Sequence, residues 1–444
     1  MSDAPLTHRR VLRIALPIVL SNATIPILGA VDTAVIGQLG QAAMMGAVAL
    51  GSVILASFYW IFGFLRMGTT GLVAQAHGAG DRAEVSAVLI RALLIGLTAG
   101  MVIVVAQGAL FWAAFKLAPA SPAVEGFAQT YLSLRIWGAP ATIALYAVTG
   151  WLIAVERTRS VLVVQLLMNG LNVGLDVWFV LSLGWGVQGV AVATLIAEWS
   201  GLAMGLWLCR DALGWAALRD RARIFDAARL ARMLAVNSDI MVRSVVLQGS
   251  FTAFVFLGAG LGDATLAANQ VLMLFLEITA FALDGFAFAA EALVGAAIGA
   301  GTRGGVRQAG ILASEWGFGG AVLLALGFWL LGPWIIDLMT TAPEVRAIAR
   351  LYLPWLAVAP VIGIASWMLD GIYIGATWTR PMRNAMLQSV GVYAVAVAVL
   401  VPAFGNHGLW AALMVLNIAR AVTLGLRYPA LERQVQSARP VPTA

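Results

Sequence analysis

The sequence predicts an all-α polytopic membrane protein with twelve transmembrane helices in two pseudo-symmetric lobes of six helices. Three observations predict this fold class. The composition is 61% apolar and only 11% charged, whereas soluble domains carry about 25% charged residues. Twelve apolar stretches are each long enough for the ~20 residues that a helix needs to cross a bilayer. An internal repeat relates the two halves of the chain.

The twelve predicted spans follow one another along the chain. The first, Ile14 to Leu39, carries two prolines, Pro17 and Pro26, and the carboxylate of Asp32. An acid inside hydrocarbon costs about 3 kcal/mol on insertion scales, so Asp32 is a candidate functional residue. The other spans are predicted at 46–76, 88–115, 131–154, 160–183, 187–209, 233–261, 266–298, 308–332, 351–376, 385–404 and 408–426.

The basic residues predict the orientation of the spans, because cytoplasmic loops collect Lys and Arg. With the N-terminus in the cytoplasm, twenty-one of the 27 basic residues lie on the cytoplasmic side and four on the other side. We therefore expect both termini in the cytoplasm and a multi-pass protein of the plasma (inner) membrane. The first apolar run lacks a small-residue cleavage pattern, so no cleavable signal peptide is predicted.

Composition also disfavours several kinds of site. The single cysteine, Cys209, excludes an intramolecular disulfide and a cysteine-cluster metal site. The three histidines lie near span ends, and no HExxH-like motif is present, which disfavours a zinc site and an intramembrane enzyme. We expect a protein without a cofactor that binds small molecules in the lipid bilayer, does not bind nucleic acid and is monomeric.

A polar linker at the midpoint divides the chain. The predicted organisation is an N-terminal six-helix lobe (1–209), a cytoplasmic linker (210–232), a C-terminal six-helix lobe (233–426) and a cytoplasmic tail (427–444). The segment LVAQAHGAGDR after the second span recurs as LVGAAIGAGTR after the eighth, with seven identities in eleven at an offset of 221. Duplication explains these matches, and it predicts a ligand site where the two lobes meet.

Two further features follow from the repeat. The same offset of 221 pairs Gly150 with Gly371. The glycine turns at 78–80 and 299–301 are either hinge-side loops on the cytoplasmic face or tight turns that need positive φ.

Other charged residues inside the spans define a candidate substrate cavity. Glu277, Asp284 and Glu291 repeat every seven residues and so form one stripe on a helix. The candidate cavity residues are Arg66, Asp239, Arg243, Glu277, Asp284 and Asp370. Acids outnumber arginines in this set, and a cavity richer in acids prefers cationic, lipophilic compounds.

Three sequence runs resemble one known family. They are LPIVLSN with a downstream VDTAVIGQLG, FLRMGTTGLVAQAHGAGD and LDGFAFAAEALVGAAIGAG. Together they resemble the multidrug and toxic compound extrusion (MATE) family, specifically its DinF branch, over essentially the whole chain. The resemblance implies a V-shaped pair of lobes and a secondary active multidrug efflux antiporter that works by alternating access. It favours H⁺ over Na⁺ as the coupling ion.

The resemblance also implies a coupling site. Members of the branch place an Asp in the first span, an Asn and an Asp four residues apart in the fifth, and a Thr eighteen residues further on. Asp32, Asn172, Asp176 and Thr194 match these positions. Pro17 matches a helix-bending proline of the branch, and Pro26 is expected to add a second kink.

Physical chemistry supports this coupling site independently. Asn172 and Asp176 share one helix face. Two carboxylates brought together in a low dielectric repel, so at least one is expected to hold a proton near neutral pH. Their oxygens could also coordinate Na⁺, which is the only metal ion expected at this site. In the alternative, Asp176 lies at a helix end and faces water.

Two alternative functions stay open. Export of an organic anion is one, because Arg66 and Arg243 could bind a carboxylate. A flippase for lipid-linked precursors, from the same superfamily, is the other. Such flippases usually have more helices and an arginine-rich cavity, whereas this chain has twelve predicted spans and an acidic stripe.

Overall fold

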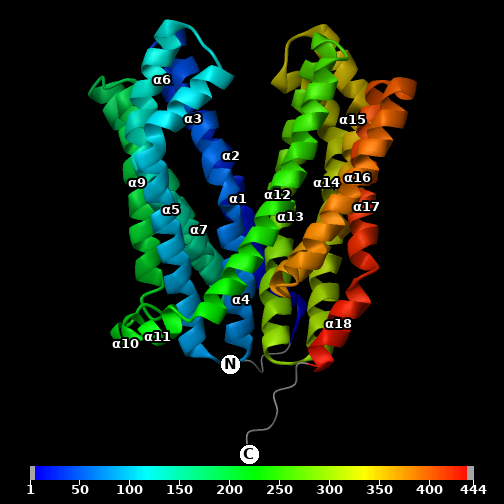
Figure 1. Ribbon diagram of the computed structural model, residues 1–444. Coiled ribbons are helices and arrows are strands. Elements are labelled where there is room, and N and C mark those ends of the chain that lie inside the picture. The colour runs from blue at the N-terminus through cyan, green and yellow to red at the C-terminus, as the bar shows by residue number, and fades with distance from the viewer. Residues whose placement is uncertain (1–5, 438–444) are drawn as a thin grey trace, which may run out of the picture. The chain divides into compact units, whose positions relative to one another are not determined.

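The computed structural model describes residues 6–437, except for the side chains of residues 26–30, 33 and 434–437 (Figure 1). Within this range the chain forms helices and no β-strand. Eleven helices are long and apolar enough to cross a membrane. The remaining predicted span is divided between α1 (His8–Ala23) and α2 (Ile25–Gly37), of 16 and 13 residues. The predicted all-helical, membrane-spanning fold class is confirmed.

Contacts divide the chain into two compact units. Unit 2 comprises Leu20–Val73 and Asp81–Arg232. Unit 1 combines the start of the chain up to Val19, the short segment Ala74–Gly80 and everything from Met233 onward. This division differs from the predicted lobe boundaries at the two short segments, which pack with the C-terminal half of the chain.

Unit 2 contains the helices of the N-terminal half. They are α2, α3 (Ala42–Ile61), most of α4 (Gly63–Gly78), α5 (Arg82–Leu117), α6 (Pro122–Arg135), the 3-10 turn η1 (Ile136–Gly138), α7 (Ala139–Ala154), α8 (Thr158–Asp176), the π-helical turn η2 (Val177–Ser182), α9 (Val187–Leu208), α10 (Trp215–Arg219) and α11 (Arg221–Ile224). Small residues let these helices approach closely, as is typical in membranes. Gly100 of α5, for example, lies against the backbone of Pro140 in α7.

Unit 1 contains the helices of the C-terminal half. They are α12 (Ala227–Ala259), α13 (Asp263–Gly299), α14 (Arg303–Met339), α15 (Pro343–Gly375), α16 (Thr379–Phe404), α17 (Asn406–Gly425) and α18 (Tyr428–Ser437). Aromatic rings fill part of its core. Phe254 meets Trp410 edge to face with ring centroids 5.0 Å apart, and Phe275 meets Phe328 in the same way at 5.2 Å. Such pairs stabilise a core beyond the area they bury.

The internal repeat is visible in the helix packing. A Cβ atom at Gly150 would lie 2.5 Å from the carbonyl oxygen of Arg66, and one at Gly371 would lie 2.6 Å from that of Ala287. Both glycines and both carbonyls are related by the offset of 221. Each unit therefore packs one helix against another through the same glycine, which supports the pseudo-symmetry of the two halves.

The turns repeat as well. Glu156 and Thr377, again 221 residues apart, are the two non-glycine residues with positive φ in the described chain, at 60° and 51°. Gly80 and Gly301 have φ of 75° and 68°. The tight-turn explanation of the glycine motifs therefore applies to these two positions.

Gly78 and Gly299 serve a different purpose within unit 1. A Cβ atom at Gly78 would collide with the backbone carbonyl of Ala296, and one at Gly299 would collide with that of Gln75. Neither backbone carbonyl can swing away as a flexible side chain could. Glycine is thus required here by the close approach of the ends of α4 and α13.

The first span is interrupted between its two prolines, upstream of Asp32. α1 continues through Pro17 and ends at Ala23, and α2 begins at Ile25 with Pro26 in its first turn. At the interruption the carbonyl oxygen of Thr24 accepts a hydrogen bond from Asn169 of α8 at 3.4 Å. Because proline has no N–H, Pro26 cannot continue the hydrogen-bond ladder of α1. The Pro26 side chain lies outside the described residues.

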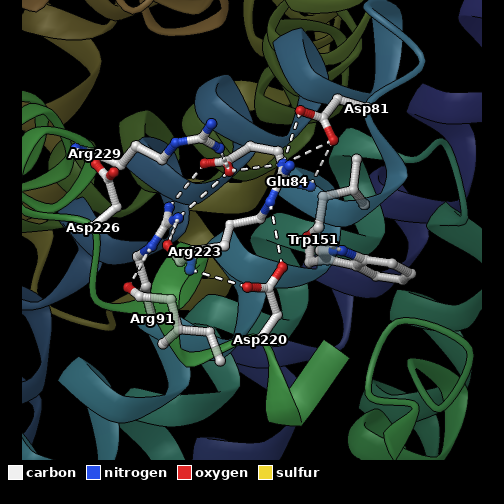
Figure 2. A network of polar contacts seen from close by, with 10 residues as sticks. Asp81, Glu84, Arg91, Trp151, Asp220, Arg223, Asp226 and Arg229 are labelled. Carbon is white, nitrogen blue, oxygen red and sulfur yellow. Dashed lines mark hydrogen bonds and ion pairs between the residues drawn. The ribbon is translucent and has the colours of Figure 1, made fainter. Parts of the chain in front are cut away.

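The predicted linker and tail are partly helical. In unit 2 the side chains of Arg223 and Arg229 reach the acids at the start of α5, where Arg223 contacts Asp81 at 3.0 Å and Arg229 pairs with Glu84 (Figure 2). Arg91 donates to Glu84 at 2.9 Å and to the carbonyl oxygen of Ile224 at 2.9 Å. These contacts fasten α11 to α5.

Two smaller features belong to the ends of the units. In unit 1, α18 buries Glu432, which contacts Arg303 at 3.4 Å. In unit 2, the single cysteine, Cys209, directly follows α9 and is fully buried. Burial raises the pKa of its thiol to about 12.

Candidate functional site

The four predicted coupling residues come together in unit 2. Asp32 lies on α2, Asn172 and Asp176 lie on α8, and Thr194 lies on α9. Asn172 donates a hydrogen bond to the Thr194 hydroxyl at 2.9 Å, and that hydroxyl donates to the carbonyl of Val190 at 2.9 Å. The carboxyls of Asp32 and Asp176 face each other within hydrogen-bonding reach when one of them carries a proton.

Asp176 does not face water. It is the last residue of α8, but its exposed fraction is 0%, as is that of Asn172. The chain continues without a break into the π-helical turn η2, and such turns are frequent at functional sites. The alternative of a solvated acid at a helix end is therefore wrong.

Several oxygens of this site lack a donor. Oδ1 of Asp32, both carboxylate oxygens of Asp176 and Oδ1 of Asn172 are buried and accept no hydrogen bond within the described chain. Burying a polar oxygen without a hydrogen-bond donor destabilises the folded protein. A proton held between the two carboxyls, or a Na⁺ ion ligated by these oxygens, would satisfy them.

Sequence reasoning missed a buried ion pair in the same unit. Arg135, which lies within the predicted span 131–154, ends α6 and donates to Glu198 of α9 at 2.6 Å, with both side chains 9% exposed. It also donates to the hydroxyl of Tyr131 at 3.4 Å. Glu198 lies one helical turn after Thr194, so an acid inside a predicted span was the signal that could have revealed it.

The Arg135 charge bears on the coupling site. It acts electrostatically on both Asp32 and Asp176 without forming an ion pair with either. Glu198 holds the guanidinium instead, and a side chain at Gly138 would collide with the Glu198 carboxylate. The two aspartates are thus left as acids without an ionic partner in the described chain.

Two of the predicted cavity acids of unit 1, Asp239 and Asp370, form ion pairs with arginines. Asp239 accepts hydrogen bonds from Arg383 at 2.6 Å and from Thr379 at 3.1 Å. Asp370 is bridged by Arg243 and Arg420. Sequence reasoning had placed Arg420 near the cytoplasmic surface, but it is 1% exposed. Because arginines compensate the charge of both aspartates, these two residues do not supply the excess negative charge that was expected for the cavity.

The remaining predicted cavity residues are scattered. Along α13, Glu277 is exposed, Asp284 is half-buried and Glu291 is 2% exposed, so the three acids do not share one environment. Arg243 pairs with Asp370 and not with this stripe. Arg66 lies on α4 in unit 2 and is 9% exposed. No cluster of three His, Cys, Asp or Glu residues suited to a metal ion occurs in the described part of the chain.

A polytopic bundle of two pseudo-symmetric halves with a buried ionisable pair is the architecture of a secondary transporter. The sequence matches the family model described as MatE twice, over residues 17–178 and 240–400. The DNA damage-inducible protein F of Escherichia coli (strain K12) is 39% identical over 432 residues, which cover 95% of this chain and 91% of that protein. The chain belongs to the MATE family, whose members are transporters and not enzymes.

Another relative and two solved structures are similar to this chain over nearly its whole length. A probable multidrug resistance protein NorM of Rhizobium meliloti (strain 1021) is 24% identical over 98% of this chain and 96% of that protein. A crystal structure of a MATE protein in the bent conformation superposes with a TM-score of 0.85 at 19% identity, over 96% of each chain. An outward-facing multidrug resistance MATE transporter gives a TM-score of 0.84 at 18% identity, over 97% of each chain. These structures support the fold.

Proposed function

We propose that this protein is a multidrug efflux antiporter that exports lipophilic, mainly cationic compounds in exchange for H⁺. The observation that carries the proposal is the pair of Asp32 and Asp176, in which Oδ1 of Asp32 and both carboxylate oxygens of Asp176 are buried and lack donors within the described chain. A site of this kind binds a monovalent cation strongly. The family's relatives that are named probable multidrug resistance proteins support efflux as the direction of transport.

The proposed mechanism is alternating access. An external proton binds the Asp32 and Asp176 pair and removes its negative charge. The neutral pair lets the interrupted first span, with Pro17 and Pro26 in α1 and α2, change its bend, and bound drug leaves outward. When the proton leaves to the cytoplasm, the re-ionised carboxylates favour a cationic substrate again. Coupling requires only that proton and drug bias one conformational equilibrium in opposite directions.

Vesicle transport tests the proposal. Inverted vesicles carrying the protein, whose lumen corresponds to the outside of the cell, receive a cationic dye in the surrounding medium under an imposed pH gradient with an acidic lumen, so that export appears as dye uptake. We expect Asp32→Asn to lower dye export about tenfold or more, which is the size of a typical coupling free energy. The matched control is Asp211→Asn, because Asp211 is a half-exposed acid paired with Arg157. Full export by Asp32→Asn would refute the proposed coupling site.

The same assay separates the two coupling ions. Proton-driven export continues in Na⁺-free medium and collapses when a protonophore is added. Export that requires a Na⁺ gradient and survives the protonophore would assign Na⁺ to the oxygens of Asp32, Asn172, Asp176 and Thr194 instead.

We further propose a monomer in the plasma (inner) membrane with both termini in the cytoplasm, supported by the distribution of arginines. Organic-anion export is the second candidate function. The bridging of Asp370 by two arginines favours it, because it gives unit 1 a buried positive charge. Nothing specific in the described residues favours the lipid-linked precursor flippase.

A further inference from the structure

Unit 1 contains a buried cluster in which one carboxylate meets two guanidinium groups. Asp370 lies on α15, Arg243 on α12 and Arg420 on α17, and the three side chains are 8%, 8% and 2% exposed. Both arginines use the same nitrogen, Nη2, to contact the same oxygen, Oδ2 of Asp370. We call these three residues the Asp370 cluster.

The Asp370 cluster carries an excess positive charge. Two arginines remain ionised under all ordinary conditions, and one carboxylate compensates only one of them. Within the described chain no other acid forms an ion pair with Arg243 or Arg420. Asp239, which lies one turn before Arg243 on α12, is engaged elsewhere, since it pairs with Arg383. A net charge buried at this depth is strongly unfavourable unless a counter-ion joins it.

Donors that suit such a counter-ion are present. The Nε–H groups of Arg243 and Arg420 are buried and have no partner among the described residues, and the same holds for the hydroxyl of Ser244. Asn417 accepts a hydrogen bond from Nη1 of Arg420 at 3.2 Å and so fixes that guanidinium in place. Guanidinium groups with free N–H donors recognise carboxylates by paired, charge-assisted hydrogen bonds.

We propose that Arg243 and Arg420 bind a monovalent anionic group beside Asp370, namely the carboxylate of a lipophilic compound. Chloride has the same charge and acceptor chemistry and is the other source of such a group. The site extends the proposed substrate range from lipophilic cations to compounds that carry a carboxylate. It rests on the proposed function only in that the bound compound is also a transported one.

A purely structural ion cluster makes a different prediction, and Asp370 tells the two apart. In Asp370→Asn the carboxamide keeps the shape of the side chain but leaves both arginines without a carboxylate. An anion site then becomes more positive and binds anions more tightly. A cluster with only a structural role would lose stability and gain no affinity for anions.

The experiment measures binding of naphthoate and of its neutral analogue naphthamide. The full chain is placed in nanodiscs of phosphatidylcholine, which is net neutral, and binding to empty nanodiscs is subtracted. We expect the wild type to prefer naphthoate over naphthamide. Arg243→Gln should weaken naphthoate binding about tenfold, the loss of one charged hydrogen-bonding partner, and Asp370→Asn should strengthen it by a similar factor. Arg350→Gln, at an exposed ion pair of the same unit, is the matched control and should change neither affinity.

Further arms keep the outcome decisive. Arg243→Lys keeps the charge but lacks the planar guanidinium with its paired N–H donors. It replaces Arg243→Gln if that variant aggregates, and it should show a smaller loss of naphthoate affinity. Chloride that displaces naphthoate places both in one site. Chloride binding that Arg243→Gln abolishes, with no naphthoate preference in the wild type, assigns the site to the inorganic ion.

Equal binding of naphthoate and naphthamide without any chloride binding overturns the proposal. Unchanged naphthoate binding in both Arg243→Gln and Asp370→Asn does so too. Because binding is measured without a proton gradient, this failure is distinct from a failure of dye export in vesicles.

Discussion

At the scale of single residues, the site in unit 2 depends on which acid forms an ion pair with one arginine, Arg135. Arg135 lies near Asp32 and Asp176, but its hydrogen bond goes to Glu198 at 2.6 Å. As long as Glu198 holds the guanidinium, the two aspartates lack an ionic partner among the described residues, which is the basis of the cation affinity proposed above. Glu198 thus acts on the coupling site through Arg135.

This arrangement gives a prediction for Glu198→Gln. The freed charge of Arg135 would stabilise the ionised aspartates, so protons would bind them less tightly. We expect the half-maximal point of dye export to move to lower external pH by about one unit or more. The pH profile of export in vesicles measures this shift.

The double variant Arg135→Gln with Glu198→Gln is the control, because it removes both charges and should return the profile toward that of the wild type. A profile that stays in place in Glu198→Gln, in protein that remains monodisperse, would exclude this role for Glu198.

At the scale of helices, two glycines hold the ends of α4 and α13 together in unit 1. Gly299→Ala would place a Cβ atom against the backbone carbonyl of Gln75, which cannot yield without moving the helix. We expect the melting temperature to fall, reflecting a loss of about 1–3 kcal/mol, as is typical of overpacking. Thermal unfolding in nanodiscs measures this change.

Gly319→Ala provides the matched control for that prediction. A Cβ atom there would meet nothing within 4 Å. Alanine favours helix over glycine by about 1 kcal/mol, so this variant should hold or gain stability. Equal melting temperatures for the two variants would show that the close approach of α4 and α13 at Gly299 does not limit stability.

The contact between the linker and α5 gives a pH-dependent prediction. Partial burial of Asp81 opposes its ionisation, but hydrogen bonds from the Glu84 N–H and from Arg223 outweigh burial and hold the pKa of Asp81 below its ordinary value of 3.8. An acid with a lowered pKa in the folded state stabilises that state above its ordinary pKa and loses this effect as the pH falls through the lowered value.

We therefore expect α11 to stay fastened to α5 from neutral pH down to about pH 4, near the ordinary pKa of an aspartate, and to loosen below it. Limited proteolysis of the linker reports this opening, with an acid-active protease below about pH 4 and a second protease that is active at neutral pH. Asp81→Asn should make the linker more susceptible already at neutral pH. Equal susceptibility of the variant and the wild type across this range would contradict the assignment.

How much the sequence could predict differs from element to element. The spans could be predicted from apolar length, which is a local property, and the coupling set was predicted from the resemblance to the MATE family, whose motif spacing these four residues match. The partners of Arg135, Arg243 and Arg420 could not be predicted, since each reaches an acid at least 50 residues away in the chain. The interruption at Thr24 lay between two prolines, and the sequence alone did not decide which of them ends the helix.

At the scale of the whole molecule, the distribution of arginines predicts one orientation in the membrane. We expect a green fluorescent protein fused to the C-terminus to fluoresce in cells, and alkaline phosphatase fused there to be inactive, because the former folds only in the cytoplasm and the latter only outside it. Fusions in the loop between α5 and α6 should behave in the opposite way. Active phosphatase at the C-terminus would reverse the predicted topology.

The duplication is the second property of the whole chain. Glycines 150 and 371 make the same contact in their own units, and residues 156 and 377 adopt the same unusual backbone conformation. The charged residues do not follow this symmetry, since one unit holds Asp32 and Asp176 without an ionic partner among the described residues and the other buries Arg243 and Arg420 against Asp370. The shared scaffold therefore carries two sites of opposite charge.

The burial of Cys209 has a practical consequence for measuring motion. Burial shields the Cys209 thiol from maleimides and, by raising its pKa to about 12, keeps it almost entirely protonated at neutral pH. The natural protein therefore needs no cysteine removal before spectroscopic labelling. One cysteine introduced on the surface of each unit would carry a dye or spin label, and the distance between the labels could be followed through a transport cycle in the otherwise unaltered chain.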